Sequence, residues 1–223
     1  MEWKRKNRKN HDLLSEVMWF AKLEKTTQLS AISKRKVLVL IDEQNLTRGV
    51  LDHNFMLQYD LLAEQIRSIA SSAKLHIFIA AKANDGKRRK HFARTGYIVH
   101  IKTIRRKCSD NQLQWDHNVD NLFAFWAGLI ARRNRYDTLI LASGDYGLSG
   151  EISEAICQLR GPGNKLQIMS LSVTGSTSSG LETRWNPYIA NNLKIGLDLL
   201  RPLGPLNRWS FGRKGNNHHE RFC

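Results

Sequence analysis

The stretch Val37-Leu38-Val39-Leu40-Ile41-Asp42-Glu43-Gln44-Asn45-Leu46 decides the fold class. It opens with five consecutive apolar residues, three of them β-branched, which is typical of a strand buried on both faces. Such a strand lies inside a mostly parallel sheet that helices cover on both sides, and ligands bind beyond the carboxyl ends of the strands in such sheets. Asp42 ends the apolar run and therefore stands where a functional carboxylate is expected.

Apolar runs and amphipathic segments on the carboxyl side of this stretch predict a repeating strand–helix pattern. Further strands are expected over residues 74–81, 97–104, 138–143 and 166–173, and helices over residues 60–71, 87–94, 119–133 and 152–159. Residues 46–55 and 187–200 predict only short helical turns, and residues 108–114 a polar loop. Five strands that alternate with helices predict a three-layer α/β sandwich with a mostly parallel five-stranded sheet.

The segments that flank this pattern differ from it in composition. Residues 1–35 contain a basic arm and an expected amphipathic helix over residues 12–25, residues 36–200 form the expected domain, and residues 201–223 form a basic tail. No apolar run approaches the roughly 20 residues that span a bilayer, and no apolar region follows the basic start as in a secretory signal. The three cysteines lack metal-binding spacing, so we expect a cytoplasmic protein in a reducing compartment.

The strongest compositional signal is a formal net charge of +15 with a pI of about 10.0. A large positive field attracts polyanions, above all nucleic acids. Solubility, an acidic protein or an anionic membrane surface are alternative explanations. We favour nucleic acid because the positive charges occur in clusters.

Acidic residues follow several of the predicted elements at one end of the sheet. Asp42 ends the first strand, Asp145 follows the strand over residues 138–143, and Asp120 begins the helix that leads into that strand. Asp116 lies just before that helix. Clustered carboxylates repel each other unless a cation neutralises them, and Mg²⁺ or Mn²⁺ suits oxygen ligands that also handle phosphate. An ion held there would activate water for attack on a phosphodiester.

Each acid also has a purely structural explanation. Asp42 and Asp145 can form turns with their own backbone, and Asp120 can be a helix N-cap. Asn45 is either a turn former or a site residue that orients a ligand. Only the coincidence of the acids at one sheet end favours a site.

Cationic and polar residues near the same end are the candidate nucleic-acid contacts. Ser143 either binds a phosphate or merely ends its strand. The expected nucleic-acid-binding residues are Ser143, Lys82, Lys87, Arg88, Arg89, Arg105, Arg106 and Lys107. The basic run over residues 87–94 can equally be a solvated helix face.

Three segments in order resemble the NYN domain, a branch of the PIN-like ribonuclease superfamily. The run ending in Ile41-Asp42 with Asn45-Leu46 resembles its "I-D-x-x-N-L" opening, His117-Asn118-Val119-Asp120 its "K-G-V-D" helix start, and residues 136–145 its "Y-D-x-hydrophobic run-S-G-D" segment. The resemblance covers about residues 36–173. It implies a Rossmann-like sandwich and a Mg²⁺- or Mn²⁺-dependent endoribonuclease whose acidic site is formed by Asp42, Asn45, Asp120 and Asp145.

The chain also departs from the family pattern at two positions. Trp126 stands where the family commonly has a further acid, and Tyr146-Gly147-Leu148 follows Asp145 where another acid and an aromatic residue are usual. Asp116 is a candidate replacement. The alternative to a ribonuclease is therefore a catalytically degenerate RNA-binding or scaffold subunit of a ribonucleoprotein. RNA is the expected partner, DNA stays an alternative because no residue is an obvious reader of the 2′-hydroxyl, and the sequence leaves open a homodimer or a larger complex.

Overall fold

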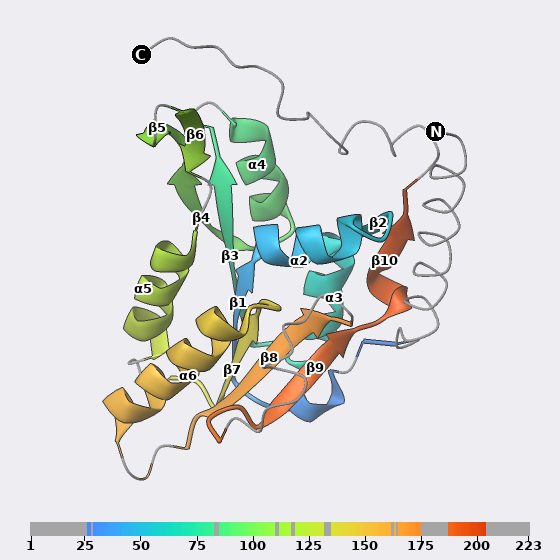
Figure 1. Ribbon diagram of the computed structural model, residues 1–223. Coiled ribbons are helices and arrows are strands. Elements are labelled where there is room, and N and C mark those ends of the chain that lie inside the picture. The colour runs from blue at the N-terminus through green and yellow to red at the C-terminus, as the bar shows by residue number, and fades with distance from the viewer. Residues whose placement is uncertain are drawn as a thin grey trace, which may run out of the picture.

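A six-stranded parallel sheet forms the centre of the computed structural model (Figure 1). The structure describes residues 26–27, 29–82, 85–109, 112–116, 119–131, 135–161, 163, 165–174 and 187–203, with the side chains of 105–109, 112–116, 131 and 146 left undescribed. The strand order is β4-β3-β1-β7-β8-β9, and every neighbouring pair is parallel.

The elements follow one another along the chain with short connections. The sheet strands are β1 (Val37–Asp42), β3 (Lys74–Ala81), β4 (Ile98–Thr103), β7 (Thr138–Ala142), β8 (Gln167–Val173) and β9 (Asn191–Ile195). The α-helices are α2 (Glu43–Leu51), α3 (Tyr59–Ile69), α4 (Gly86–Arg94), α5 (Asp120–Ala131) and α6 (Tyr146–Arg160). Outside the sheet, β2 (Phe55–Leu57) pairs with β10 (Leu200–Pro202), and β5 (Arg105–Ser109) with β6 (Gln112–Asp116).

Helices cover both faces of the sheet, because the central strand presents apolar residues to both. Val39 and Ile41 of β1 belong to the core that α2, α3 and α4 cover, whereas Leu38 and Leu40 belong to the core under α5 and α6. Every residue of β1 is buried, Asp42 included. The predicted three-layer α/β sandwich is therefore confirmed.

The sheet has one strand more than the five predicted. The sequence predicted a helical turn over residues 187–200, but β9 forms there and pairs with β8, placing Leu171 beside Leu193 and Val173 beside Ile195. Leu193 and Ile195 are buried while Lys194 between them is partly exposed, which is the two-residue period of a strand, but Asn191 and Asn192 are both exposed and interrupt it. A pattern of only five residues was too short to reveal that period.

Within residues 108–114, predicted as a loop, residues 108–109 and 112–114 belong to an antiparallel strand pair that projects beyond the carboxyl end of β4 (Figure 1). Its strands β5 and β6 pair Arg105 with Asp116 and Ser109 with Gln112. Each of the two strands pairs its inward-facing backbone groups with the other, so cross-strand pairing decides the structure of these polar residues. The basic residues Arg105, Arg106 and Lys107 therefore lie on a strand.

Two helices are longer than predicted. The irregular turn expected over residues 46–55 is the helix α2, which begins directly after Asp42. Helix α6 begins at Tyr146, whereas the sequence predicted its start at Ile152. Two glycines in the first turns, Gly147 and Gly150, lower the helix propensity there and concealed the start. Both helices begin at the carboxyl edge of the sheet, which brings their first turns to the candidate site.

Some predictions fall on segments that the structure does not describe. The basic arm, the helix expected over residues 12–25 and most of the basic tail lie outside the described residues, although Arg201 and Pro202 belong to β10. Within the described part of the chain, no helix is long and apolar enough to cross a membrane.

Candidate functional site

Asp42 stands at the corner between β1 and α2. Its side chain is 4% exposed, and its Oδ1 accepts a hydrogen bond of 3.1 Å from the backbone N–H of Asn45. The residue is the N-cap of α2, where a short acceptor satisfies an otherwise unpaired N–H of the first turn. The strand therefore ends in a carboxylate that is ordered by the helix following it.

Burial raises the pKa of the Asp42 carboxyl to about 6. The nearby carboxylates of Asp120 and Glu43 raise it as well, whereas the hydrogen bond from the Asn45 N–H lowers it. At neutral pH the group is an anion that its surroundings disfavour. A bound cation at this corner would remove that penalty.

Asn45 connects the corner after β1 to the corner after β7. Its Oδ1 accepts a hydrogen bond of 2.6 Å from the backbone N–H of Gly144. The chain runs outward from β1 through β3 to β4 and then returns to β7 on the other side of β1, so the two corners meet at a topological switch point. Crevices at such points are the usual ligand sites of parallel sheets.

The corner after β7 contains the predicted residues Ser143 and Asp145. Ser143 is fully buried, and its Oγ accepts from the Asp145 N–H at 3.3 Å, so its hydroxyl orders the loop. Asp145 is exposed and is the N-cap of α6, its Oδ1 accepting from the Gly147 N–H at 2.9 Å. The structure thus gives both side chains a contact within the turn, and leaves the carboxylate of Asp145 open to solvent.

The other two predicted acids lie on the path from the hairpin into α5. Asp120 is the first residue of α5, is partly exposed, and is close enough to Asp42 to influence its charge. Asp116 ends β6, and its side chain is not among those that the structure describes. Among the described residues, no group of three or more His, Cys, Asp and Glu side chains is placed to hold a metal ion.

Glu43, which is buried, and Arg88, which is partly exposed, form an ion pair that the sequence did not predict. Glu43 directly follows Asp42 and pairs with the guanidinium of Arg88, whose side chain is 35% exposed. Glu43 is a charged residue that the fold buries in a helical first turn, and no local sequence signal distinguished it from a solvated acid. Arg88 was predicted to contact RNA as part of a basic run, and the structure uses its guanidinium within the protein.

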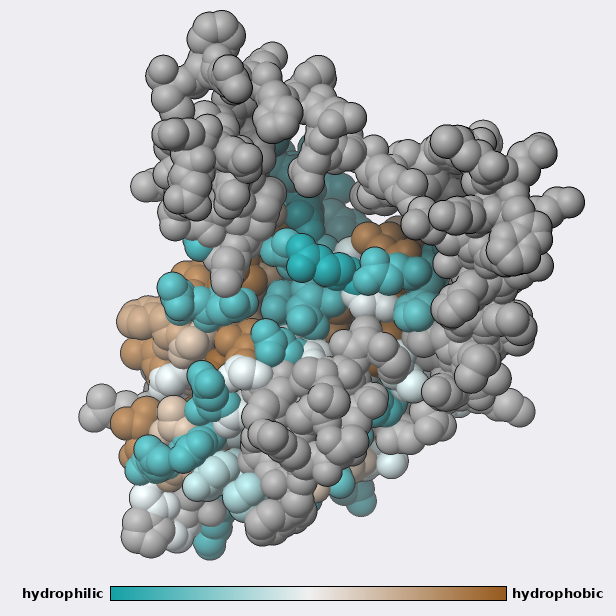
Figure 2. Space-filling view, viewed as in Figure 1, coloured by the Kyte–Doolittle hydropathy of each residue, from teal (hydrophilic) through white to brown (hydrophobic). Residues whose placement is uncertain are grey.

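The remaining predicted cations surround the carboxyl ends of β3 and β4. Lys82 follows β3 and is exposed, as are Lys87 and Arg89 in the first turn of α4. Arg105, Arg106 and Lys107 lie on β5, and their side chains are outside the description. Figure 2 shows hydrophilic residues over α2 on this side of the molecule, and hydrophobic ones over α5. The described cations therefore lie at the same sheet edge as Asp42.

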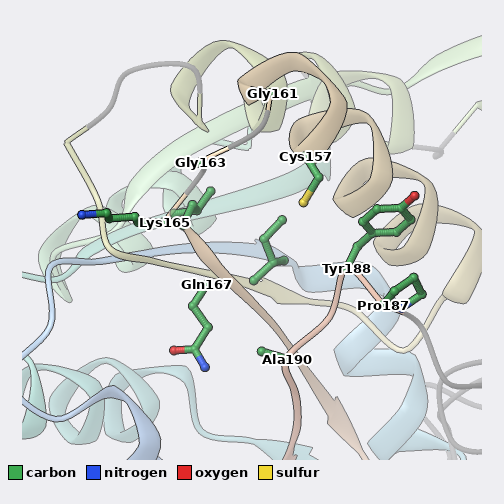
Figure 3. Close-up of a pocket in the computed structure, with 10 residues that line it drawn as sticks. Cys157, Gly161, Gly163, Lys165, Gln167, Pro187, Tyr188 and Ala190 are labelled. Atoms are coloured by element: carbon green, nitrogen blue, oxygen red, sulfur yellow. The ribbon is translucent and has the colours of Figure 1, made fainter.

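A pocket of about 450 Å³ lies at the opposite edge of the sheet (Figure 3). It is formed where α6 ends and where β8 and β9 begin, and Cys157, Lys165 and Tyr188 are among its lining residues. None of the described residues that line it is a carboxylate. The candidate site at Asp42 and this pocket are therefore separated by the length of the strands.

Comparison with known proteins agrees with this geometry. A crystal structure of a protein of unknown function from Vibrio parahaemolyticus RIMD 2210633 has a TM-score of 0.58 at 20% identity, covering 75% of this chain and 97% of that chain, and this likeness shows the fold. No curated protein matches the sequence. The profile of the NYN domain matches residues 36–190, which is more than half of the chain and contains both corners of the switch point. The chain therefore belongs to the NYN domain family, a branch of the PIN-like nucleases.

Proposed function

We propose that this protein is a metal-dependent endoribonuclease whose reaction centre is the crevice between Asp42, Asp120 and the corner after β7. The observation that carries the proposal is the buried carboxylate of Asp42 at the switch point, beside Asp120 and with its pKa raised to about 6. The cap hydrogen bond from Asn45 does not offset the burial of this acid, and strongly perturbed acids at such places are typical of ligand sites.

The residues present suit a hard divalent ion. Asp42 and Asp120 offer carboxylate oxygens from two different elements, and Asp145 offers a solvent-accessible carboxylate at the corner after β7. Mg²⁺ or Mn²⁺ prefers such ligands and would supply polarisation of the phosphodiester and a more acidic bound water. Asn45 links the corner after β1 to the corner after β7 by accepting a hydrogen bond from the Gly144 N–H.

The substrate class follows from charge. Exposed lysine and arginine side chains on α4 and after β3, together with the basic sequence of β5, would bind the phosphates of a polyanionic strand. Single-stranded RNA suits such a surface because phosphate contacts follow the backbone without requiring a base-paired groove.

The test is cleavage of a 5′-labelled single-stranded RNA by the purified protein with Mn²⁺, Mg²⁺ or a chelator. Metal-dependent cleavage that is lost in Asp42→Asn and retained in Asp52→Asn would support the proposal, since Asp52 is an exposed acid at the far end of the same helix. A DNA strand of the same sequence serves as the second substrate. Equal cleavage by wild type and Asp42→Asn would contradict the proposal.

A second candidate function is RNA binding without cleavage. Two observations favour it: the described acids do not form a three-ligand cluster, and Trp126, at a position where the family commonly has an acid, packs on His100 with ring centroids 4.5 Å apart. Tight RNA binding whose affinity falls steeply with salt, without any metal-dependent product, would select this function.

A further inference from the structure

Helix α4 is held to the fold by few apolar contacts. It has nine residues, and Phe92 is the only one of them that is buried. The Phe92 ring packs edge-on against Tyr59 and Tyr97, with centroids 5.5 and 5.9 Å away. One aromatic anchor near the carboxyl end fixes where the helix ends and leaves the direction of its first turns to other contacts.

Arg88 supplies those contacts in the first turns. One guanidinium nitrogen, Nη2, pairs with the carboxylate of Glu43, and the other, Nη1, donates to the backbone carbonyl of Ala80 at 3.1 Å. The Arg88 N–H also donates to Oδ1 of Asp85, the N-cap of α4, at 3.3 Å. The side chain thus joins α4 to the end of β3 and to the first residue of α2.

Glu43 is itself fixed by a hydrogen-bond network. Its second carboxylate oxygen, Oε1, accepts from the Thr47 hydroxyl at 3.0 Å, and its backbone carbonyl accepts from the Tyr59 hydroxyl at 3.0 Å. The Tyr59 and Thr47 hydroxyls lie 3.0 Å apart. Both carboxylate oxygens are therefore engaged within the protein, and Glu43 acts as a rigid receptor for the guanidinium.

We propose that Arg88 is a positioning residue whose ion pair with Glu43 holds the cationic helix α4 beside Asp42, so that Lys87, Arg89 and Lys90 bind the RNA phosphates next to the acidic crevice. These three side chains are exposed, in contrast to the engaged guanidinium of Arg88. The inference rests on the proposed function in taking RNA as the ligand. In this proposal the Glu43–Arg88 pair fixes the position of the cations of α4 relative to Asp42. Arg88 itself is then not a phosphate contact.

The experiment measures binding of a labelled single-stranded RNA by fluorescence anisotropy, in a chelator, over a series of salt concentrations. The variants are Glu43→Gln, Arg88→Gln, their double mutant, and Lys87→Gln. Glu64→Gln is the matched control because Glu64 is exposed on α3 and the charge change is the same as at Glu43. Glu43→Gln raises the formal net charge of +15 by one, so a general electrostatic effect would tighten RNA binding.

The proposal predicts the opposite sign for this variant. Glu43→Gln weakens RNA binding about five- to tenfold. It also lowers the slope of log K against log salt concentration by more than the roughly 0.7 that one phosphate contact contributes in single strands, because several cations of α4 are misplaced together. Arg88→Gln gives a similar loss, and the double mutant loses no more than either single mutant because all three remove one interaction. Lys87→Gln lowers the slope by one contact, and Glu64→Gln binds at least as tightly as wild type.

A charge-conserving variant separates positioning from direct contact and also covers the case in which Glu43→Gln fails to fold. Arg88→Lys keeps the cation but loses the fork that reaches both Glu43 and Ala80. Weaker binding in a folded Arg88→Lys protein supports positioning, whereas wild-type affinity overturns it. Unchanged or tighter binding in folded Glu43→Gln overturns it as well. If wild-type protein binds no RNA, the proposed function fails first, and that result is distinct from RNA binding with an inert Glu43–Arg88 pair.

Discussion

The two corners at the switch point use the same local device with different results. After β1, Asp42 caps α2 by accepting from the N–H of Asn45, and after β7, Asp145 caps α6 by accepting from the N–H of Gly147. β1 ends in Asp42 itself, whereas Ser143 and Gly144 separate the end of β7 from Asp145, and in both cases the carboxylate immediately precedes a helix. Asp42, however, is 4% exposed while Asp145 is exposed to solvent.

The different burial of these two caps separates the roles that their carboxylates can have. Burial, with Asp120 and Glu43 nearby, raises the pKa of Asp42 to about 6, so its charge costs stability that a cation could return. Asp145 is exposed to solvent, so capping α6 does not require its carboxylate to be buried. A helix-capping carboxylate is therefore a candidate metal ligand when it is buried, as at Asp42, and only a helix cap when it is exposed, as at Asp145.

The largest expected effect is on cleavage. If the proposed function holds, Asp42→Asn should reduce metal-dependent RNA cleavage by about 100-fold or more, because the substitution would remove the carboxylate proposed as a metal ligand. Asp145→Asn should reduce it by only about tenfold, since that carboxylate is exposed to solvent. Single-turnover rates at saturating Mn²⁺ measure both. Equal losses at the two positions would show that depth does not distinguish the corners.

The next effect is on stability and has a defined pH dependence. The folded-state pKa of Asp42 lies at about 6, above the ordinary 3.8, so folding binds a proton and the ionised group destabilises the fold. The free-energy cost of ionised Asp42 is absent below about pH 3.8 and grows as the pH rises toward about 6. Above about pH 6 the cost is fully present. Asp42→Asn should therefore stabilise the metal-free protein by up to about 3 kcal/mol at pH 7.5.

Urea unfolding of wild type and Asp42→Asn in a chelator, at about pH 7.5 and about pH 4, measures that difference. Burial lowers the pKa of His76 to about 4, so this group also titrates across the range, but it contributes equally to both proteins. The same substitution at Asp145 serves as the comparison and should not stabilise. A stability gain at Asp42 that does not shrink at low pH would contradict the assignment of its charge.

A smaller effect is expected from separating the corners. Asn45→Ala removes the hydrogen bond to the Gly144 N–H and leaves that donor without its partner in a buried loop. We expect a loss of about 1–2 kcal/mol in the free energy of unfolding. We also expect slower RNA cleavage, because the corners after β1 and β7 would no longer be held in a fixed relative position. A double-mutant cycle with Asp42→Asn measures the coupling, and additive effects would show that the corners act independently.

The smallest effect is expected at the exposed cap. Asp145→Ala should cost about 1 kcal/mol, which is typical of losing an N-cap side chain, with the loss confined to the first turn of α6. Asp145→Ser should restore most of that stability, because a hydroxyl caps well. Hydrogen exchange of the Gly147 amide reports the cap directly. A stability gain at neutral pH would place Asp145 in the same class as Asp42.

The sequence predicted those parts of the fold that carry a strong local pattern. The runs in β1, β3 and β7 are long, apolar and bounded by polar residues, so their existence, order and parallel arrangement could be predicted. Asp42 and Asp145 could be placed at the same sheet end because they follow such runs. The strand β9 and the β5–β6 hairpin were missed, because five-residue segments rich in Asn, Gln or Arg have no dominant local preference and their pairing partners decide.

The sequence by itself determined the class of fold, the sheet edge at which the acids gather and the family, since periodicity and ordered motifs are local properties of the chain. The tertiary structure alone decided which of two equivalent caps is buried and that Arg88 meets Glu43, which lies 45 positions earlier in the chain. Burial and ion pairing depend on what packs against a residue from distant segments. The charge state of Asp42 and the engagement of Arg88 are therefore properties of the assembled fold.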